Sequence, residues 1–385
     1  QTEAISVFDH INDRGLSLTS ADLIKNRIFQ KVADEEFSLI SESWLDMSKT
    51  LNKCDIRRLH DPKYLMRALA WTQSGGKKIT YDNLTEFWTN YLKDSENKAT
   101  DFAMDLSTDA SFLRQYAALE HDLHGSLPEL FMAKHLKSVQ HYPLLLAIRH
   151  FQDPKVFKRV VKQIHNRTTF YVLAQERTQA FETIVPRWAS KLFALGPKAT
   201  LEQVDKIYSE EALLTGANFE VLKAEMLSWN YDNASDRVKL RAVLSHLSWL
   251  VDRHLSKEQA SVGEYFKTRK AKKDKFGWDV DHVLPTIKAG KDVHYQTIGN
   301  LVLLYPQDNR GLKDVDPAEK KTPYLQHPLY LTKTAAGFND LADADSKKLR
   351  KLFEDAGVTE YLWDLQNWNE NSVTARGEFY FNLLK

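Results

Sequence analysis

Hydrophobic residues recur at helical spacing along most of the chain. The clearest start lies at Thr19, whose hydroxyl can cap a helix and which is followed three positions later by Asp22. Apolar residues then occupy positions 23, 24, 28 and 29, which fall on one face of a helix. Further helices are predicted at about 36–51, 62–73, 81–94, 128–137, 153–174, 176–193, 199–211, 236–254, 338–356 and 371–384. The pattern therefore predicts a mainly α-helical protein with a helical bundle-like region.

The periodicity changes near Gly277. Residues 278–285 and 301–305 are short runs with the composition of β-strands, and the segment between them contains Gly290 and several charges, as is typical of a loop. A helix is predicted from about Pro306. We therefore expect one small two-stranded element and a helix embedded in an otherwise α-helical chain.

Length and composition indicate a folded chain of more than one domain. The 385 residues exceed what one hydrophobic core commonly serves, and 43% hydrophobic with 27% charged residues is typical of a folded, soluble protein. No apolar run approaches the roughly 20 residues that span a bilayer, and residues 1–13 lack the pattern of a signal peptide. Because Cys54 is the single cysteine, an internal disulfide and a zinc site of several thiolates are excluded. We expect a reducing, cytoplasmic location.

Net charge gives no direct indication of a partner. The formal charge is +1, but a nucleic-acid-binding protein can concentrate its positive charge on one face. A basic run precedes the first predicted strand and consists of Lys267, Arg269, Lys270, Lys272, Lys273 and Lys275. Such runs are commonly solvated surface, yet Lys270, Lys272 and Lys273 are also placed to contact phosphates with an affinity that falls with salt. The sequence leaves both interpretations open.

Candidate chemistry lies in the first predicted strand. Residues 278–285 read Trp-Asp-Val-Asp-His-Val-Leu-Pro, and strand alternation places Asp279 and Asp281 on one side with His282 on the other. A break at Pro285 lets the end of the strand open into a site. The carboxylate of Asp281 and the amide of Asn309 are hard oxygen donors, which suit Mg²⁺, with Mn²⁺ or Ni²⁺ as alternatives.

These residue types suit cleavage of a phosphodiester bond. That reaction needs an activated water, in-line attack, and neutralisation of charge on the phosphate and the leaving oxygen. Neutral His282 can take the proton from water, since an imidazole titrates at about 6.5. An ion on Asp281 and Asn309 can stabilise the phosphorane, and Arg310 or Lys313 can add positive charge.

The motif residues resemble a known family. Residues 279–285, 298–301 (Ile-Gly-Asn-Leu) and 308–311 (Asp-Asn-Arg-Gly) resemble in order the HNH nuclease motif, including that of the RNA-guided CRISPR effector nucleases. Residues 298–304 and 320–324 (Lys-Lys-Thr-Pro-Tyr) are similar more closely to the C-terminal HNH domain of GmrSD-type restriction systems and of the phosphorothioate-sensing SspE nuclease. The resemblance implies a ββα-metal element that cleaves DNA in bacterial defence against phage.

The resemblance also implies roles for individual residues. His282 matches the general base, and Asp281 and Asn309 match the metal ligands. Asn300 matches the middle asparagine, which in the family is usually structural, so it is the weaker of the catalytic candidates His282, Asn300 and Asn309. Asp281 stands where many members have a glutamate, and Asn309 stands where others have a histidine.

A second resemblance lies near the N-terminus. Residues 8–16 and 21–26 are similar to the close of the ParB-like N-terminal domain that precedes this HNH domain in the family. We therefore expect the C-terminal portion of a larger effector, whose N-terminal sensor or NTPase domain would be a partner in the same protein. The expected division is a ParB-like remnant at 1–30, a helical domain or connector at 31–235, and an HNH domain with flanking helices at 236–385.

The leading functional prediction is a metal-dependent HNH endonuclease that nicks or cuts DNA, such as phage or modified DNA, in a restriction system. An alternative is a DNA-binding or protein-interaction module that retains the HNH fold without turnover. RNA is a third possibility for the substrate, because nothing in these residues reads a 2′-hydroxyl. Metal-dependent nicking of plasmid DNA separates the first two.

Overall fold

The computed structural model describes residues 19–32, 34–93, 96–119, 135–174, 178–210, 216–255, 262–267, 277–290, 292–337, 341, 343–355, 357 and 363–385. Contacts between Cα atoms divide the chain into two compact units. Unit 1 comprises Gln1–His121, Val139–Thr168 and Glu176–Ala212. Unit 2 comprises Asp122–Ser138, Thr169–Gln175 and Leu213–Lys385.

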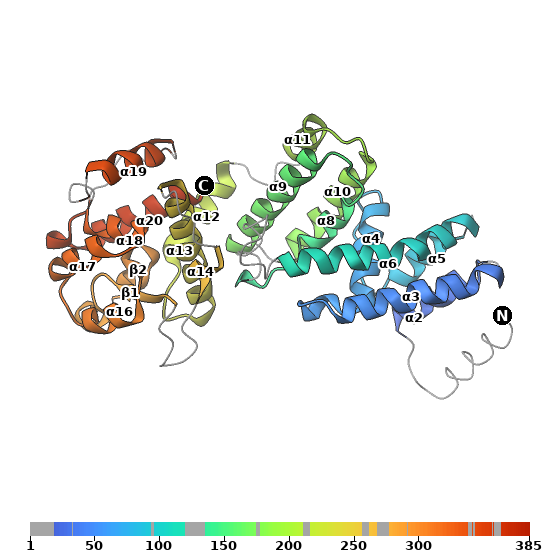
Figure 1. Ribbon diagram of the computed structural model, residues 1–385, viewed down its shortest axis with the longest axis horizontal. Coiled ribbons are helices and arrows are strands. Elements are labelled where there is room, and N and C mark those ends of the chain that lie inside the picture. The colour runs from blue at the N-terminus through green and yellow to red at the C-terminus, as the bar shows by residue number, and fades with distance from the viewer. Residues whose placement is uncertain are drawn as a thin grey trace. The chain divides into compact units, whose positions relative to one another are not determined.

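The regular structure of unit 1, among its described residues, is helical, with short 3-10 turns at Asp34–Glu36 and Arg57–Leu59. Its helices are α2 (Ser20–Phe29), α3 (Phe37–Asn52), α4 (Pro62–Gln73), α5 (Leu84–Tyr91), α6 (Glu96–Leu119), α8 (Tyr142–Ala147), α10 (Thr178–Ala194) and α11 (Leu201–Glu210), with most of α9 (Pro154–Leu173) (Figure 1). The predicted capping box is present, since the Thr19 hydroxyl accepts from the Asp22 amide and the Asp22 side chain accepts from Thr19. Helix α3 packs along α6, and α10 packs against α4 and α8. Fully buried tryptophans, Trp71, Trp88 and Trp188, fill the interior.

Unit 2 surrounds a small sheet with helices. Its elements are α12 (Gly216–Ser228), α13 (Ala234–Leu255), α14 (Val262–Phe266), β1 (Asp279–His282), α15 (Thr286–Ala289), β2 (Leu301–Leu304), α16 (Pro306–Leu312), α17 (Lys321–Gln326), α18 (Tyr330–Lys333), α19 (Asp343–Asp355) and α20 (Glu370–Leu384). Short 3-10 turns at Val293–Gln296, Ile298–Asn300, Pro317–Lys320, Thr334–Ala336 and Leu365–Asn367 join them. Helix α16 packs against β1, and α18 packs against β2 (Figure 1).

The two strands pair in antiparallel register, with Asp281 opposite Val302 and His282 opposite Leu301. All four residues of β2 are buried. Leu301 and Leu303 point into the larger core of unit 2, whereas Val302 joins a smaller core with Tyr324. A strand covered on both faces needs apolar residues in sequence, which explains the run Leu-Val-Leu-Leu.

Most of the predicted elements are confirmed. The strands predicted at 278–285 and 301–305 are observed at Asp279–His282 and Leu301–Leu304, and the helix predicted at 236–254 is α13. The sequence analysis did not predict α6, α12 or the short helices α8, α14, α15, α17 and α18. Helices of one or two turns carry too little periodicity, and the apolar residues of α6 and α12 are not concentrated on one face. The helix predicted at 128–137 lies mostly outside the described residues. No described helix combines the length and apolar character of a membrane span.

Candidate functional site

The end of β1 places the two most reactive side chains on opposite faces of the sheet. Register and alternation put Asp281 on the face of Val302, in the smaller core, and His282 on the face of Leu301, in the larger one. The two side chains consequently hydrogen-bond to different partners.

Asp281 belongs to a buried ion pair. Its carboxylate accepts from Nζ of Lys320 at 2.9 Å (Oδ2) and 3.2 Å (Oδ1), and from the hydroxyl of Tyr324 at 2.8 Å. Relative exposure is 3% for Asp281 and 0% for Lys320, so water does not share these bonds. The same ammonium donates to the backbone oxygen of His282 at 2.6 Å. The pair therefore holds the end of β1 against the turn Pro317–Lys320 and helix α17.

Burial dominates the electrostatics of this network. Loss of water raises the pKa of the Asp281 carboxyl, against the opposing effect of the Lys320 ammonium. Loss of water likewise lowers the pKa of Lys320, against the attraction of Asp281. Burial also raises the pKa of Tyr324 well above its usual value, so it remains a neutral donor. Each charge is tolerated in this core because the other is present.

His282 is half-buried and its ring is held in place. Its Nε2 lies 2.9 Å from Oε1 of Gln296, and its ring meets Tyr231 edge-on with the centroids 5.1 Å apart. Because an amide oxygen can only accept, Nε2 carries the proton and the neutral ring keeps its lone pair on Nδ1. The His282 side chain is partly exposed, and no described residue hydrogen-bonds to its Nδ1.

Burial lowers the pKa of His282 below its usual value, with Gln296 opposing that shift and Lys320 adding to it. The imidazole is therefore neutral near pH 7. A neutral, oriented imidazole with an accessible lone pair can accept a proton.

Asn300 holds the loop that leaves β1. Its amide nitrogen donates to the backbone oxygens of Leu284 (3.0 Å) and Tyr295 (2.7 Å), and its oxygen accepts from the amide of Leu284 (2.9 Å) and from Nε1 of Trp368 (3.0 Å). Its relative exposure is 0%. Two donors and two lone pairs are the whole capacity of an asparagine side chain, so none remains for a substrate.

The other predicted site residues lie on or after α16, or outside the described residues. Asn309 is half-exposed on α16, and no hydrogen bond from its side chain to a described residue is found. Arg310 is exposed, and its Nε donates to the Pro306 oxygen at 3.0 Å. Lys313 is exposed at the C-cap. Lys270, Lys272 and Lys273 lie outside the described residues.

The predicted metal ligands can be tested against this geometry. Carboxylate and amide oxygens are suitable donors for Mg²⁺, but the Asp281 carboxylate already accepts three hydrogen bonds, two of them from an ammonium that neutralises it. Across the described residues, no group of three or more histidine, cysteine, aspartate and glutamate side chains is arranged to hold a metal ion. As arranged, Asp281 does not fit the role of a metal ligand.

Several residues of the site carried no role in the sequence analysis. Lys320 and Tyr324 were noted only for their family resemblance, although their spacing of four places them on one side of a helical turn. No sequence pattern marks Gln296 or Arg376 as part of the site. Arg376 of α20 is a buried guanidinium whose NH1 donates to the backbone oxygens of Gly299 (2.9 Å) and Leu301 (3.1 Å).

Comparison with known proteins identifies the class of this region. Residues 219–383 match the model of a protein family, and that range contains the sheet, α16 and every site residue described above. The match supports a restriction-endonuclease-type nuclease in this region, and a domain of that kind implies DNA as its substrate. The matched family is that of the GmrSD restriction endonucleases, C-terminal domain, which supports the predicted resemblance of this part of the chain to a GmrSD-type C-terminal region. A search of curated proteins finds no match to the chain.

Proposed function

We propose that residues 219–383 hydrolyse phosphodiester bonds in DNA by an HNH-type reaction, with His282 as the general base. The observation that carries the proposal is the oriented, neutral imidazole at the end of β1, inside a region that matches a restriction endonuclease domain. The chain order of β1, β2 and α16 also agrees with a ββα element.

The residues around His282 suit proton transfer. Nδ1 accepts the proton of the attacking water, while the Nε2–H bond to Gln296 keeps the ring in one orientation. When the ring becomes charged, the Gln296 oxygen still accepts from Nε2–H and stabilises the imidazolium. Tyr231 restricts rotation of the ring from the side.

We propose that five cationic side chains of this region bind the DNA backbone. Arg310 and Lys313 are exposed at and after the end of α16, and Lys270, Lys272 and Lys273 precede β1 in the sequence. Contacts of this kind give an affinity that falls with salt and carries no sequence preference. Substituting Arg310 should therefore weaken binding to all DNA sequences equally.

We propose separately that Asp281 and Asn309 hold a divalent ion. The reaction steps above do not depend on that ion, because Lys320 occupies the Asp281 carboxylate. An ion at this carboxylate requires the ammonium to leave, so Lys320 and the ion should compete. Calorimetric titration with Mn²⁺ tests this. Tighter binding to Lys320→Met than to the unmodified chain supports competition, and equal binding contradicts it.

The nuclease proposal is tested by nicking of supercoiled plasmid with Mg²⁺, Mn²⁺ or Ni²⁺. His282→Ala should abolish nicking, whereas His254→Ala, which removes an exposed histidine of α13, should leave it unchanged. Nicking that survives His282→Ala would exclude this residue as the base. Paired RNA substrates establish the class of nucleic acid.

The buried ion pair favours one second candidate. A carboxylate locked by Lys320 suits a module that binds DNA or protein without turnover. DNA binding by gel shift with no cleavage under any of the three ions would support that alternative.

We also propose the wider setting that the sequence predicts. It comprises a bacterial restriction system directed at phage or modified DNA, a ParB-like segment at 1–30, a helical connector at 31–235 and a nuclease domain at 236–385. Cleavage of modified and unmodified DNA by the same chain tests whether residues 236–385 contribute to discrimination. Equal rates would place discrimination elsewhere.

A further inference from the structure

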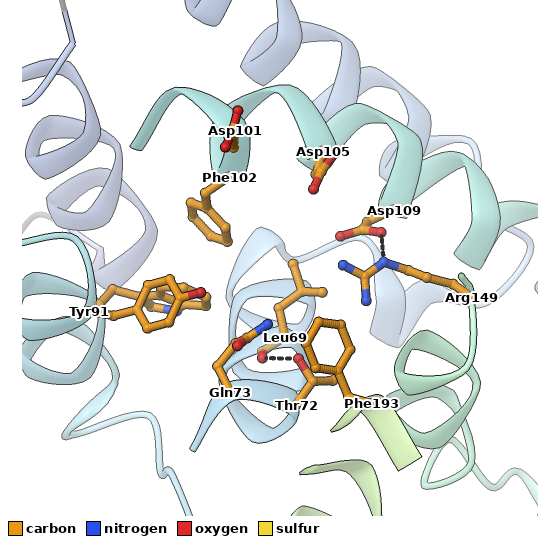
Figure 2. Close-up of a pocket in the computed structure, with 11 residues that line it drawn as sticks. Leu69, Thr72, Gln73, Tyr91, Asp101, Phe102, Asp105, Asp109, Arg149 and Phe193 are labelled. Carbon is orange, nitrogen blue, oxygen red and sulfur yellow. Dashed lines mark hydrogen bonds and ion pairs between the residues drawn. The ribbon is translucent and has the colours of Figure 1, made fainter. Parts of the chain in front are cut away.

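Unit 1 contains a pocket that lies outside the nuclease region. It has a volume of about 180 Å³ and is lined by residues of α4, α5, α6 and α10, together with Arg149, which follows α8 (Figure 2). A cavity of this size holds many water molecules, so a small organic molecule can enter it.

One wall of the pocket is acidic. Asp101, Asp105 and Asp109 are spaced four residues apart on α6, so they share one face with about 6 Å between successive positions. Asp101 and Asp105 are exposed, whereas Asp109 has a relative exposure of 2%. The negative charge therefore extends from solvent into the interior, as Figure 2 shows along the helix.

The innermost aspartate lacks a partner for one of its oxygens. Oδ1 of Asp109 pairs with Nε of Arg149, but Oδ2 is buried without a hydrogen-bond donor among the described residues. Figure 2 shows this oxygen turned away from Arg149, toward the middle of the pocket. A buried carboxylate oxygen without a donor is costly, so a ligand that brings an N–H donor to this oxygen would be favoured.

Aromatic rings also line the pocket, with Phe102 on α6 itself and Trp88 and Tyr91 on α5. Trp88 stacks on Phe102 with the ring centroids 4.1 Å apart, and Tyr91 meets Trp88 edge-on at 5.3 Å. Ring faces attract cations, and alkyl chains pack well against them. Three carboxylates against one guanidinium repel phosphates and other anions.

We propose that this pocket binds a small organic dication with an alkyl body, of the diaminoalkane class. One ammonium donates to Oδ2 of Asp109, the alkyl chain lies along Trp88 and Phe102, and the second ammonium lies near Asp105, one helical turn closer to solvent. A diamine matches two acceptors in line better than a single metal ion, which would leave the aromatic wall unused.

Isothermal titration calorimetry of the full chain tests this, with 1,4-diaminobutane as the probe and butane-1,4-diol as the neutral analogue. The diamine should bind at one saturable site and the diol should not bind. Asp109→Asn should weaken binding by about tenfold or more, because a hydrogen bond to a charged partner is lost. Asp105→Asn should weaken it by a smaller factor.

Glu202→Gln is the matched control, since it removes one exposed carboxylate outside the pocket and should leave binding unchanged. Circular dichroism shows whether Asp109→Asn is folded. If it is not, the diamine affinity of Asp105→Asn, which changes an exposed residue, tests the proposal instead. Equal binding of the diol, binding unaffected by the pocket variants, or absence of diamine binding would each overturn the proposal. Plasmid nicking is measured separately, so its failure does not bear on this site.

Discussion

Replacing Lys320 by methionine should strongly destabilise unit 2. Methionine has a similar length, so packing in the smaller core is largely retained, but the ammonium is lost from Asp281 and from the backbone oxygen of His282. The carboxylate is then left buried with Tyr324 as its main donor. Removing one partner of a buried ion pair costs about 3–5 kcal/mol, and with relative exposures of 3% and 0% this pair is in that class.

The double variant Asp281→Asn/Lys320→Met separates charge from packing. With both charges gone, no uncompensated charge remains in the core, so most of the lost free energy of unfolding should return. Urea denaturation measures the free energy, and hydrogen exchange of peptides covering β1 and β2 assigns the change to unit 2. The control is Lys288→Met, which breaks an ion pair with Asp316 that is accessible to solvent and should cost less than about 1 kcal/mol.

If Lys320→Met lowers the free energy of unfolding no more than Lys288→Met does, the Asp281–Lys320 pair is not a buried pair of the kind described. A double variant as unstable as Lys320→Met would also contradict this description. Metal binding gives an independent outcome, since competition for Asp281 predicts that Mn²⁺ stabilises Lys320→Met more than the unmodified chain.

Other variants test the support of the site. Gly299→Ala places a Cβ 1.8 Å from the backbone oxygen of Val373, so urea denaturation should show a free energy of unfolding lower by at least about 2 kcal/mol. The control is Gly311→Ala in α16, whose new Cβ meets nothing within 4 Å and which should be neutral or stabilising by up to about 1 kcal/mol. Asn300→Ala leaves four partly buried hydrogen-bonding groups without their partner, so it should cost about 3 kcal/mol and speed hydrogen exchange in β1. An unchanged denaturation midpoint would contradict the structural role of Asn300. Burial raises the pKa of Asp252 from 3.8 to about 6, so the contribution of this carboxyl to stability is present below about pH 4 and is lost as pH rises through 6. Relative to Asp252→Asn, the free energy of unfolding of the unmodified chain should fall by roughly 3 kcal/mol over that window. Parallel pH profiles of the two proteins would contradict this.

Local pattern was sufficient for much of the fold and for the position of the site. Helical spacing predicted α13, two short runs with the composition of β-strands predicted β1 and β2, and a helix was predicted from about Pro306. Alternation along β1 correctly placed Asp281 and His282 on opposite sides. Such features depend on neighbours within a few residues, and a single sequence contains that information.

Long-range packing decided what each polar side chain does. Lys320 lies 39 positions after Asp281, and Trp368 lies 68 positions after Asn300, yet these contacts determine whether a carboxylate is free and whether an amide can meet a substrate. The pocket of unit 1 likewise depends on Arg149, which approaches Asp109 from a distant segment. The sequence alone established which chemical groups are present and on which element each lies. Only the tertiary structure decided their partners, because a buried polar group is satisfied by whichever donor or acceptor the packing brings to it.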